Sequence, residues 1–260
     1  MLYALGCFAA AGVALAALAL QRRSSRLRSV GRGLLITWFT ALLLFATGEI
    51  YFRYFFAESE NVFTGATTNW LARYWHTNSL GYRDRDWTPE AYAGKQTILV
   101  TGDSFTAGWG INNPADRFTD VLARDLGDRY AVINLGIYGT ATPEQLDLLK
   151  AYPLQDPDVV LMQYFLNDID YTGLQLGLLP TPAAKPEWTQ GSYLLDFLYV
   201  RLLSGLLDPQ ANVDWWEWNY AAYDNQGIWS IHQQEIEDYI DYVESIHARL
   251  IVVIFPNMLD

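Results

Sequence analysis

Two long uncharged stretches open the sequence. The first runs from Leu2 to Leu20 and the second from Gly33 to Gly48, and mostly aromatic and apolar residues extend the second to position 56. A helix needs about 20 predominantly apolar residues to cross a bilayer, and both stretches are long enough. The pattern therefore predicts a transmembrane hairpin of two helices over residues 1–56.

Basic residues separate the two stretches. Five arginines and no acidic residue lie between positions 22 and 32, and short loops rich in Arg stay in the cytoplasm. A cleaved signal peptide carries its basic residues before its apolar run, which is the opposite order. We therefore expect a two-pass protein of the bacterial inner membrane, with the rest of the chain on the periplasmic or extracellular side. Glu49 and Arg53 are four residues apart and are expected to pair on one helix face.

After residue 95, short apolar runs alternate with helical patterns. Strands are expected at 97–101, 130–135, 158–165 and 250–255, with helices at 118–126, from 142 and at 236–246. The run at 158–165 is apolar at nearly every position, which is typical of a strand buried on both faces. Strands that alternate with helices favour an α/β fold with a parallel sheet covered on both sides.

The helix expected from position 142 has a clear start signal. Thr142 is a suitable N-cap, Pro143 fits the first turn, and Gln145 stands where a capping box places its glutamine. We therefore expect the Thr142 hydroxyl to close the helix start.

Residues 169–228 interrupt this alternation, and we interpret them as an insertion in an α/β domain of residues 96–260, with residues 57–95 as a lead-in. A helix is expected over Tyr193–Leu207. Large aromatic side chains then crowd a short stretch: Trp215, Trp216, Trp218, Tyr220, Tyr223 and Trp229. Such a cluster is able to stack on sugar rings, to lie on a membrane surface, or to pack a lid onto the sheet, and large aromatics serve mostly as packing area.

Charge and composition narrow the function classes. The chain has 17 basic and 29 acidic residues, and residues 57–260 alone have a net charge of −17. A body this acidic repels phosphate backbones, so nucleic-acid binding is not expected. One cysteine excludes an intramolecular disulfide framework and a multi-cysteine zinc site, and three histidines leave little room for a histidine-rich metal centre. We expect neither a metal nor a cofactor.

The segment after the first expected strand carries the candidate chemistry. Ser104 lies between Gly102 and Gly108, and a serine after a parallel strand lies at the sheet edge where such folds bind ligands. The start of a helical turn offers free N–H groups to a developing oxyanion. The pattern makes Ser104 a candidate nucleophile, although Gly-Asp-Ser also occurs in ordinary turns.

Three ordered motifs resemble the SGNH, or GDSL, hydrolase superfamily. Gly102-Asp103-Ser104 resembles its nucleophile block, Asn134-Leu135-Gly136 its second block and Asn167-Asp168 its third. Phe165 stands where the third block of the family has glycine. Asn78-Ser79-Leu80-Gly81-Tyr82-Arg83 also resembles a lead-in segment of membrane-anchored members.

The resemblance covers about residues 76–256 and implies a three-layer α/β/α sandwich on a parallel sheet with flavodoxin-like strand order. It also implies a serine ester hydrolase or O-acyltransferase with an acyl-serine intermediate. Ser104 would be the nucleophile, and Gly136 and Asn167 would donate to the oxyanion. Gly102, Asp103 and Asp168 would support them. Taken singly, Gly136 also fits a turn glycine, Asn167 a helix cap and Asp103 a turn carboxylate.

The general base of the family is missing. The family supplies it from an Asp-x-x-His segment near the C-terminus, and this chain has no such segment. The available histidines are His76, His232 and His247, for which exposed or capping positions are expected. We therefore expect the given sequence to stop before the catalytic Asp and His.

These inferences lead to two functional hypotheses. The first is an ester hydrolase or O-acyltransferase whose substrate is an acylated cell-envelope glycan or lipid ester. The second is a non-catalytic envelope binding or assembly protein that keeps a degenerate form of the fold. Both place the chain at a membrane, and neither names a protein partner.

Overall fold

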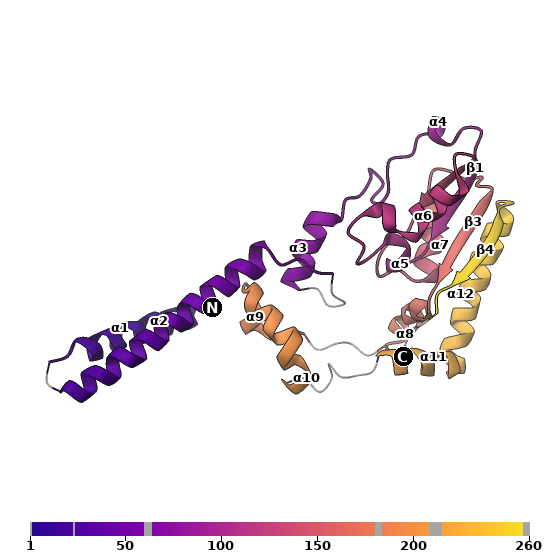
Figure 1. Ribbon diagram of the computed structural model, residues 1–260. Coiled ribbons are helices and arrows are strands. Elements are labelled where there is room, and N and C mark those ends of the chain that lie inside the picture. The colour runs from indigo at the N-terminus through magenta and orange to yellow at the C-terminus, as the bar shows by residue number, and fades with distance from the viewer. Residues whose placement is uncertain (1, 23, 60–63, 180–183, 208–214, 257–260) are drawn as a thin grey trace. The chain divides into compact units, whose positions relative to one another are not determined.

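A computed structural model of the chain describes residues 2–22, 24–59, 64–179, 184–207 and 215–256 (Figure 1). Its contacts divide the chain into two compact units. The first unit consists of Met1–Trp70 and Ala184–Asp208, and the second of Leu71–Ala183 and Pro209–Asp260. The segment 184–208, which lies inside the insertion expected from the sequence, thus clusters with the first unit.

Two long helices begin the first unit. Helix α1 spans Leu2–Leu20 and α2 spans Ser25–Tyr54, and they pack closely where a glycine faces a partner. A Cβ added at Gly31 would lie 2.7 Å from the Ala19 backbone nitrogen. Within the described residues, α2 is the helix that is long and apolar enough to cross a membrane, while the apolar stretch Phe8–Leu20 is shorter.

The end of α2 binds the start of another helical segment. Glu49 pairs with Arg53 at 2.5 Å, as expected, and its other oxygen accepts hydrogen bonds from Ser192 Oγ at 2.8 Å and the Leu194 N–H at 3.0 Å. The helix expected over 193–207 is present as three consecutive segments: α9 (Tyr193–Leu198), the π-helical η4 (Tyr199–Leu203) and α10 (Ser204–Leu207).

The second unit is built on a four-stranded parallel sheet, which confirms the α/β class. Its strands are β1 (Gln96–Thr101), β2 (Tyr130–Asn134), β3 (Val159–Tyr164) and β4 (Arg249–Ile254). The strand order is β2-β1-β3-β4, and β1 pairs with β2 on one side and with β3 on the other. The chain continues from β1 to β2 on one side of the sheet and from β3 to β4 on the other. The carboxyl ends of β1 and β3 therefore form the topological switch point, where open α/β sheets bind ligands.

Helices pack on both faces of this sheet. Alternate strand residues face alternate sides, so each strand contributes to two clusters. On one face, α6 (Phe118–Leu126) packs against Ile98, Val100, Val132 and Leu161. On the other face, α7 (Thr142–Ala151) and α12 (Gln226–Ser245) pack against Leu99, Ile133, Val160 and Met162.

Short elements complete the fold. They are α3 (Gly65–Tyr74), α4 (Pro89–Tyr92), α5 (Ser104–Ala107), η1 (Pro114–Asp116), η2 (Leu166–Ile169), α8 (Asp170–Gln175), η3 (Glu187–Thr189) and α11 (Trp215–Asp224).

The start of α7 differs from the sequence expectation. Ala141 is the N-cap, and its N–H donates to Glu144 Oε2 at 3.0 Å. Thr142 lies one position inside the helix, and its hydroxyl donates to Asp168 at 3.4 Å. The prediction that Thr142 is the cap was therefore wrong, because the buried Asp168 carboxylate, on another element, takes the hydroxyl instead.

Candidate active site

Ser104 begins α5 directly after β1, and Gly102 makes this turn possible. Gly102 has a φ of +155°, and a Cβ there would lie 2.2 Å from Thr106 Oγ1 and 2.4 Å from Gln163 Oε1. A side chain at this position would therefore collide with its neighbours. Ser104 itself is half-buried, at the carboxyl end of β1.

Asp103 caps the turn that carries Ser104. Its Oδ1 accepts from the Phe105 N–H at 2.9 Å, and its own N–H donates to Gln163 Oε1 at 3.2 Å. The side chain is buried, and burial raises the pKa of Asp103 to about 6, although hydrogen bonds from Phe105 and Asn167 oppose the rise. Asp103 is thus a turn carboxylate whose ionisation is costly at this depth.

Asn167 lies in the η2 turn that follows β3, and the structure brings it to Asp103. Its side chain is close enough to lower the pKa of the Asp103 carboxyl by hydrogen bonding. Its Oδ1 is buried and has no hydrogen-bond partner among the described residues. Asp103, which precedes Ser104, and Asn167, the expected oxyanion donor, are therefore neighbours at one edge of the sheet.

Phe165 enters this turn without strain. Its backbone is extended, with φ −134° and ψ 160°, a conformation that any residue adopts. Its ring packs against the Phe105 ring, with centroids 4.7 Å apart. The departure from the glycine of the family therefore requires no unusual backbone here and adds an apolar contact to the turn after Ser104.

Asp168 ties the Asn167 turn to α7. Its carboxylate accepts from the Phe165 N–H at 2.8 Å and from Gln145 Nε2 at 2.9 Å. Burial raises the pKa of Asp168 well above its usual range, and the nearby charge of Asp103 raises it further. Asp168 therefore holds the backbone around Asn167 in place.

Gly136 packs against α5, and its N–H already donates a hydrogen bond within the protein. The N–H donates to Asn134 Oδ1 at 2.8 Å, and a Cβ at Gly136 would lie 2.4 Å from the Ala107 nitrogen. The glycine thus lets the chain after β2 approach α5. Three residues later, Gly139 has a φ of +75° with open space around it, and its N–H makes no hydrogen bond within the described residues.

Among the described residues, Ser104 Oγ forms no hydrogen bond, to a histidine or to any other group. His76 is exposed, and His247 has a φ of 57° just after α12. His232 is fully buried, against the expectation of an exposed or capping position. Its Nδ1 lies 2.8 Å from Glu235 Oε2 and its Nε2 lies 2.7 Å from the Tyr164 hydroxyl.

This buried histidine belongs to a network that the sequence did not reveal. The Tyr164 hydroxyl also lies 2.6 Å from the Tyr223 hydroxyl, which donates to the Leu166 carbonyl at 3.1 Å. Burial raises the pKa of both phenols, so they are uncharged at neutral pH. The network therefore links α12 and α11 to the residue before Asn167.

The aromatic cluster packs over the same turn. The Trp216 ring meets the Phe165 ring edge-on at 5.9 Å, and a Cβ at Gly173 would lie 2.2 Å from the Trp218 ring. Ile169, Ala222 and Ile228 form a small core, and Trp218, Tyr223 and Trp229 pack against it. Trp216, Trp218 and Tyr223 of α11 thus contribute to packing, whereas Tyr220 is half-exposed.

A family comparison agrees with this location. The model of the GDSL-like Lipase/Acylhydrolase family matches residues 100–258, which is more than half of the chain and includes Ser104 and Asn167. Comparisons with curated proteins and with solved structures gave no match.

Proposed function

The chain belongs to the GDSL-like lipase/acylhydrolase family, and on that premise we propose that it is a serine ester hydrolase or O-acyltransferase with Ser104 as its nucleophile. The observation that carries the proposal is the position of Ser104. It begins a helical turn at the carboxyl end of β1, and the Asn167 turn of the neighbouring β3 reaches the residue beside it.

Two donors are available for the negative charge that forms when Ser104 attacks an ester carbonyl. The Ser104 N–H is the first of a helical turn and has no acceptor within that turn. The Asn167 amide, on the adjacent turn, is the second donor. Its NH₂ group has two hydrogens, so it is able to donate to Asp103 and to the oxyanion at once. Loss of one such donor typically lowers the rate by about 10²–10³. The Gly136 N–H joins this set only when it leaves Asn134 Oδ1, so the proposal rests on Ser104 and Asn167.

Hydrolysis and transfer share the acyl-serine intermediate. Ser104 Oγ bonds to the acyl carbon and loses its proton, and the ester C–O bond breaks so that the alcohol leaves with that proton. Water or an acceptor hydroxyl then attacks the same carbon, the bond from this carbon to Ser104 Oγ breaks, and Oγ takes the proton of the attacking group. The two activities differ only in the second step, so one nucleophile serves both.

We further propose that the substrate is an acylated glycan or lipid ester of the cell envelope. The support is the membrane-spanning length of α2 and the arginine-rich segment that precedes it. In this proposal α1 and α2 form a two-pass hairpin, the second unit lies on the periplasmic or extracellular side, and its helices and sheet form the three-layer sandwich of the family.

Active-site labelling tests the nucleophile. A fluorophosphonate probe should label the protein extended through its Asp-x-x-His segment, and Ser104→Ala in that protein should abolish the labelling while the far-UV circular dichroism spectrum stays unchanged. Ser245→Ala, at an exposed serine of α12, is the matched control and should be labelled as the wild type is. Equal labelling of Ser104→Ala and the wild type would overturn the assignment.

One observation favours a second function. Within the described residues, no histidine reaches Ser104, and His232 is held by Glu235 and Tyr164. A serine without an adjacent base is a weak nucleophile, which fits a non-catalytic envelope binding or assembly protein. A coding sequence that continues without an Asp-x-x-His segment, together with a well-folded protein that fails to react with the probe at any pH from 6 to 9, would support this alternative.

A further inference from the structure

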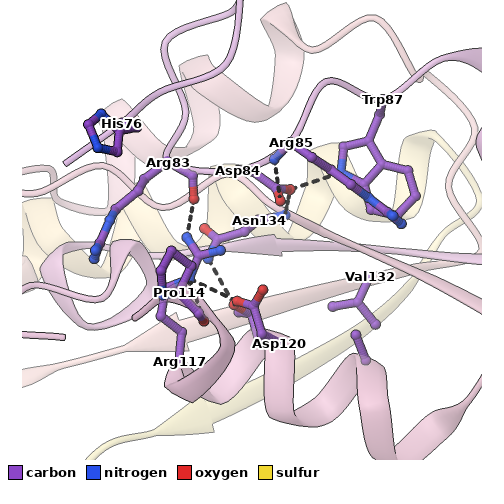
Figure 2. Close-up of a pocket in the computed structure, with 12 residues that line it drawn as sticks. His76, Arg83, Asp84, Arg85, Trp87, Pro114, Arg117, Asp120, Val132 and Asn134 are labelled. Atoms are coloured by element: carbon purple, nitrogen blue, oxygen red, sulfur yellow. Dashed lines mark hydrogen bonds and ion pairs between the residues drawn. The ribbon is translucent and has the colours of Figure 1, made fainter. Parts of the chain in front are cut away.

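A cavity of about 480 Å³ lies in the second unit (Figure 2), and one of its lining residues is Asn134, whose Oδ1 accepts from the Gly136 N–H. Its wall is formed by the segment 76–87, by η1 and α6, and by the outer side of β2. Ser104 and Asn167 do not line it. A volume of this size is within the range of small-molecule sites.

The cavity is basic although its surroundings are acidic. Three arginines and a histidine line it against two aspartates, whereas residues 57–260 as a whole carry a net charge of −17. The charged and imidazole side chains are His76, Arg83, Arg85, Arg117, Asp84 and Asp120. This local reversal of sign favours an anion at this place.

Both aspartates already have partners inside the wall. Asp84 accepts from the Asn134 N–H and from Trp87 Nε1, both at 2.9 Å. Asp120 accepts from Arg117 Nε at 2.8 Å. Their lone pairs are therefore used in holding the wall together, and a cation entering the cavity would have to compete with these bonds.

Arg117 provides a buried donor at the wall. Its side chain is only 2% exposed, Nε binds Asp120 and the Pro114 carbonyl, and Nη1 binds the Arg83 carbonyl. The remaining nitrogen, Nη2, has no hydrogen-bond partner within the described part of the chain. A buried guanidinium with an unused donor at a cavity wall is suited to bind the oxygen of a carboxylate or phosphate.

Arg85 provides the second charge, at the rim. Its guanidinium lies 3.8 Å from the centre of the Trp87 ring and forms no ion pair with any described residue. Figure 2 shows Arg85 and Trp87 on one side of the cavity wall and His76 on the other. Arg83, by contrast, donates to the carbonyls of Gly108 at 2.5 Å and Ile111 at 2.7 Å, so it supports the wall.

We propose that this cavity binds a small anionic molecule whose carboxylate or phosphate group accepts from Arg117. Arg85 attracts the ligand by its charge, His76 offers a ring nitrogen on the opposite side of the wall, and the volume admits a remainder the size of a sugar ring. The site is separate from the ester chemistry of Ser104, so either assignment stands without the other.

Calorimetry on the full detergent-solubilised chain tests this site with three probes. D-glucuronate presents a carboxylate on a sugar, inorganic phosphate presents a phosphate alone, and methyl glucoside is the neutral counterpart. We expect saturable binding of at least one anion and none of methyl glucoside, and the stronger anion identifies the chemistry. Arg85→Gln should weaken that binding up to about fivefold, the upper size for an ion pair at an exposed side chain.

The matched control is Arg124→Gln, at an exposed arginine of α6 that does not line the cavity, and it should leave binding unchanged. Arg117→Lys keeps the charge but changes the donor geometry, and it should also weaken binding. Absence of saturable binding of both anions up to about 20 mM, a weak affinity for any specific site, would overturn the proposal. So would equal weakening by Arg85→Gln and Arg124→Gln, because it would show a general charge effect.

Discussion

The Tyr223 hydroxyl donates a hydrogen bond to the Leu166 carbonyl over 3.1 Å. Through this bond, α11 is attached to the turn that holds Asn167. On the other side of the same turn, Asp168 accepts from the Phe165 N–H. The backbone that presents the Asn167 amide is therefore fixed by a phenol on one side and a carboxylate on the other.

Tyr223→Phe removes the phenol contact and leaves the ring in place. We expect the probe-labelling rate of Ser104, or ester turnover, to fall several-fold with KM unchanged, because the Asn167 donor is less well positioned. The loss of two hydrogen bonds, to Leu166 and to Tyr164, should lower the free energy of unfolding by about 2 kcal/mol. Tyr220→Phe, at a half-exposed tyrosine of the same helix, is the control. A rise in KM with an unchanged maximal rate would contradict a positioning role.

Asn167→Ala tests the oxyanion donor itself. The amide acts on a charge that exists mainly in the transition state, so turnover should fall by about 10²–10³ while KM changes little. Steady-state kinetics with a chromogenic acetyl ester measures both quantities. A variant that loses binding and keeps its maximal rate would show that Asn167 holds the substrate instead.

Two glycines of one loop should respond differently to alanine. Gly136→Ala places a Cβ 2.4 Å from the Ala107 nitrogen, and overpacking against backbone should cost about 3 kcal/mol of the free energy of unfolding. Gly139→Ala meets no neighbouring atom but must keep a φ of +75°, which should cost about 1 kcal/mol. Urea unfolding measures both, and equal losses would contradict the close contact at Gly136.

The raised pKa of Asp103 predicts how stability depends on pH. The pKa of Asp103 is about 6 in the folded protein and ordinarily 3.8. Between pH 3.8 and pH 6 the folded protein therefore keeps the Asp103 proton, whereas the unfolded chain has released it. This favourable contribution is complete below pH 3.8 and is lost as the pH rises through about 6.

Asp103→Asn removes this ionisation because the asparagine stays neutral. Its free energy of unfolding, relative to the wild type, should therefore increase from pH 4 to pH 7, by up to about 3 kcal/mol. Unfolding curves at several pH values measure the difference, with Asp116→Asn at an exposed site as the control. A difference between Asp103→Asn and the wild type that is the same at every pH would rule out the raised pKa.

Membrane topology follows from the arginine-rich segment. A periplasmic alkaline phosphatase fused after residue 60 should be active in cells, and one fused within residues 24–30 should be inactive, because the phosphatase folds only outside the cytoplasm. The reverse pattern would overturn both the topology and the envelope substrate. Immunoblots of the two fusions control for differences in expression.

The strands were predictable because their local pattern and their burial agree. Residues 158–165 are apolar at nearly every position, and the strand found there, Val159–Tyr164, is central in the sheet. Gly102 and Gly127 directly follow the first expected strand and the first expected helix, positions where turn glycines are common, and both have a positive φ. The position of Ser104 follows from the same local signals.

The contacts between distant segments were not predictable. Gln163 is the one amide in an otherwise apolar strand, and that anomaly was a usable sign of its role in holding Asp103 and Thr106. The contact of His232 with Tyr164 joins residues 68 positions apart, and no local sequence pattern indicates it. The prediction of the α7 cap was wrong for the same reason, because Asp168, which binds the Thr142 hydroxyl, comes from another part of the chain.

Strand β4 has consequences for the 260-residue chain when it is expressed by itself. It is the last strand of the sheet, paired on one side with β3 within the described residues, and Val252 and Ile254 on it are 48% and 71% exposed. An unpaired strand edge accepts another extended chain, while the acidic surface keeps identical copies apart. Salt shortens the reach of that repulsion from about 10 Å at 0.1 M to about 3 Å at 1 M. Concentrated salt should therefore promote self-association through β4, and light scattering across a salt series would measure it.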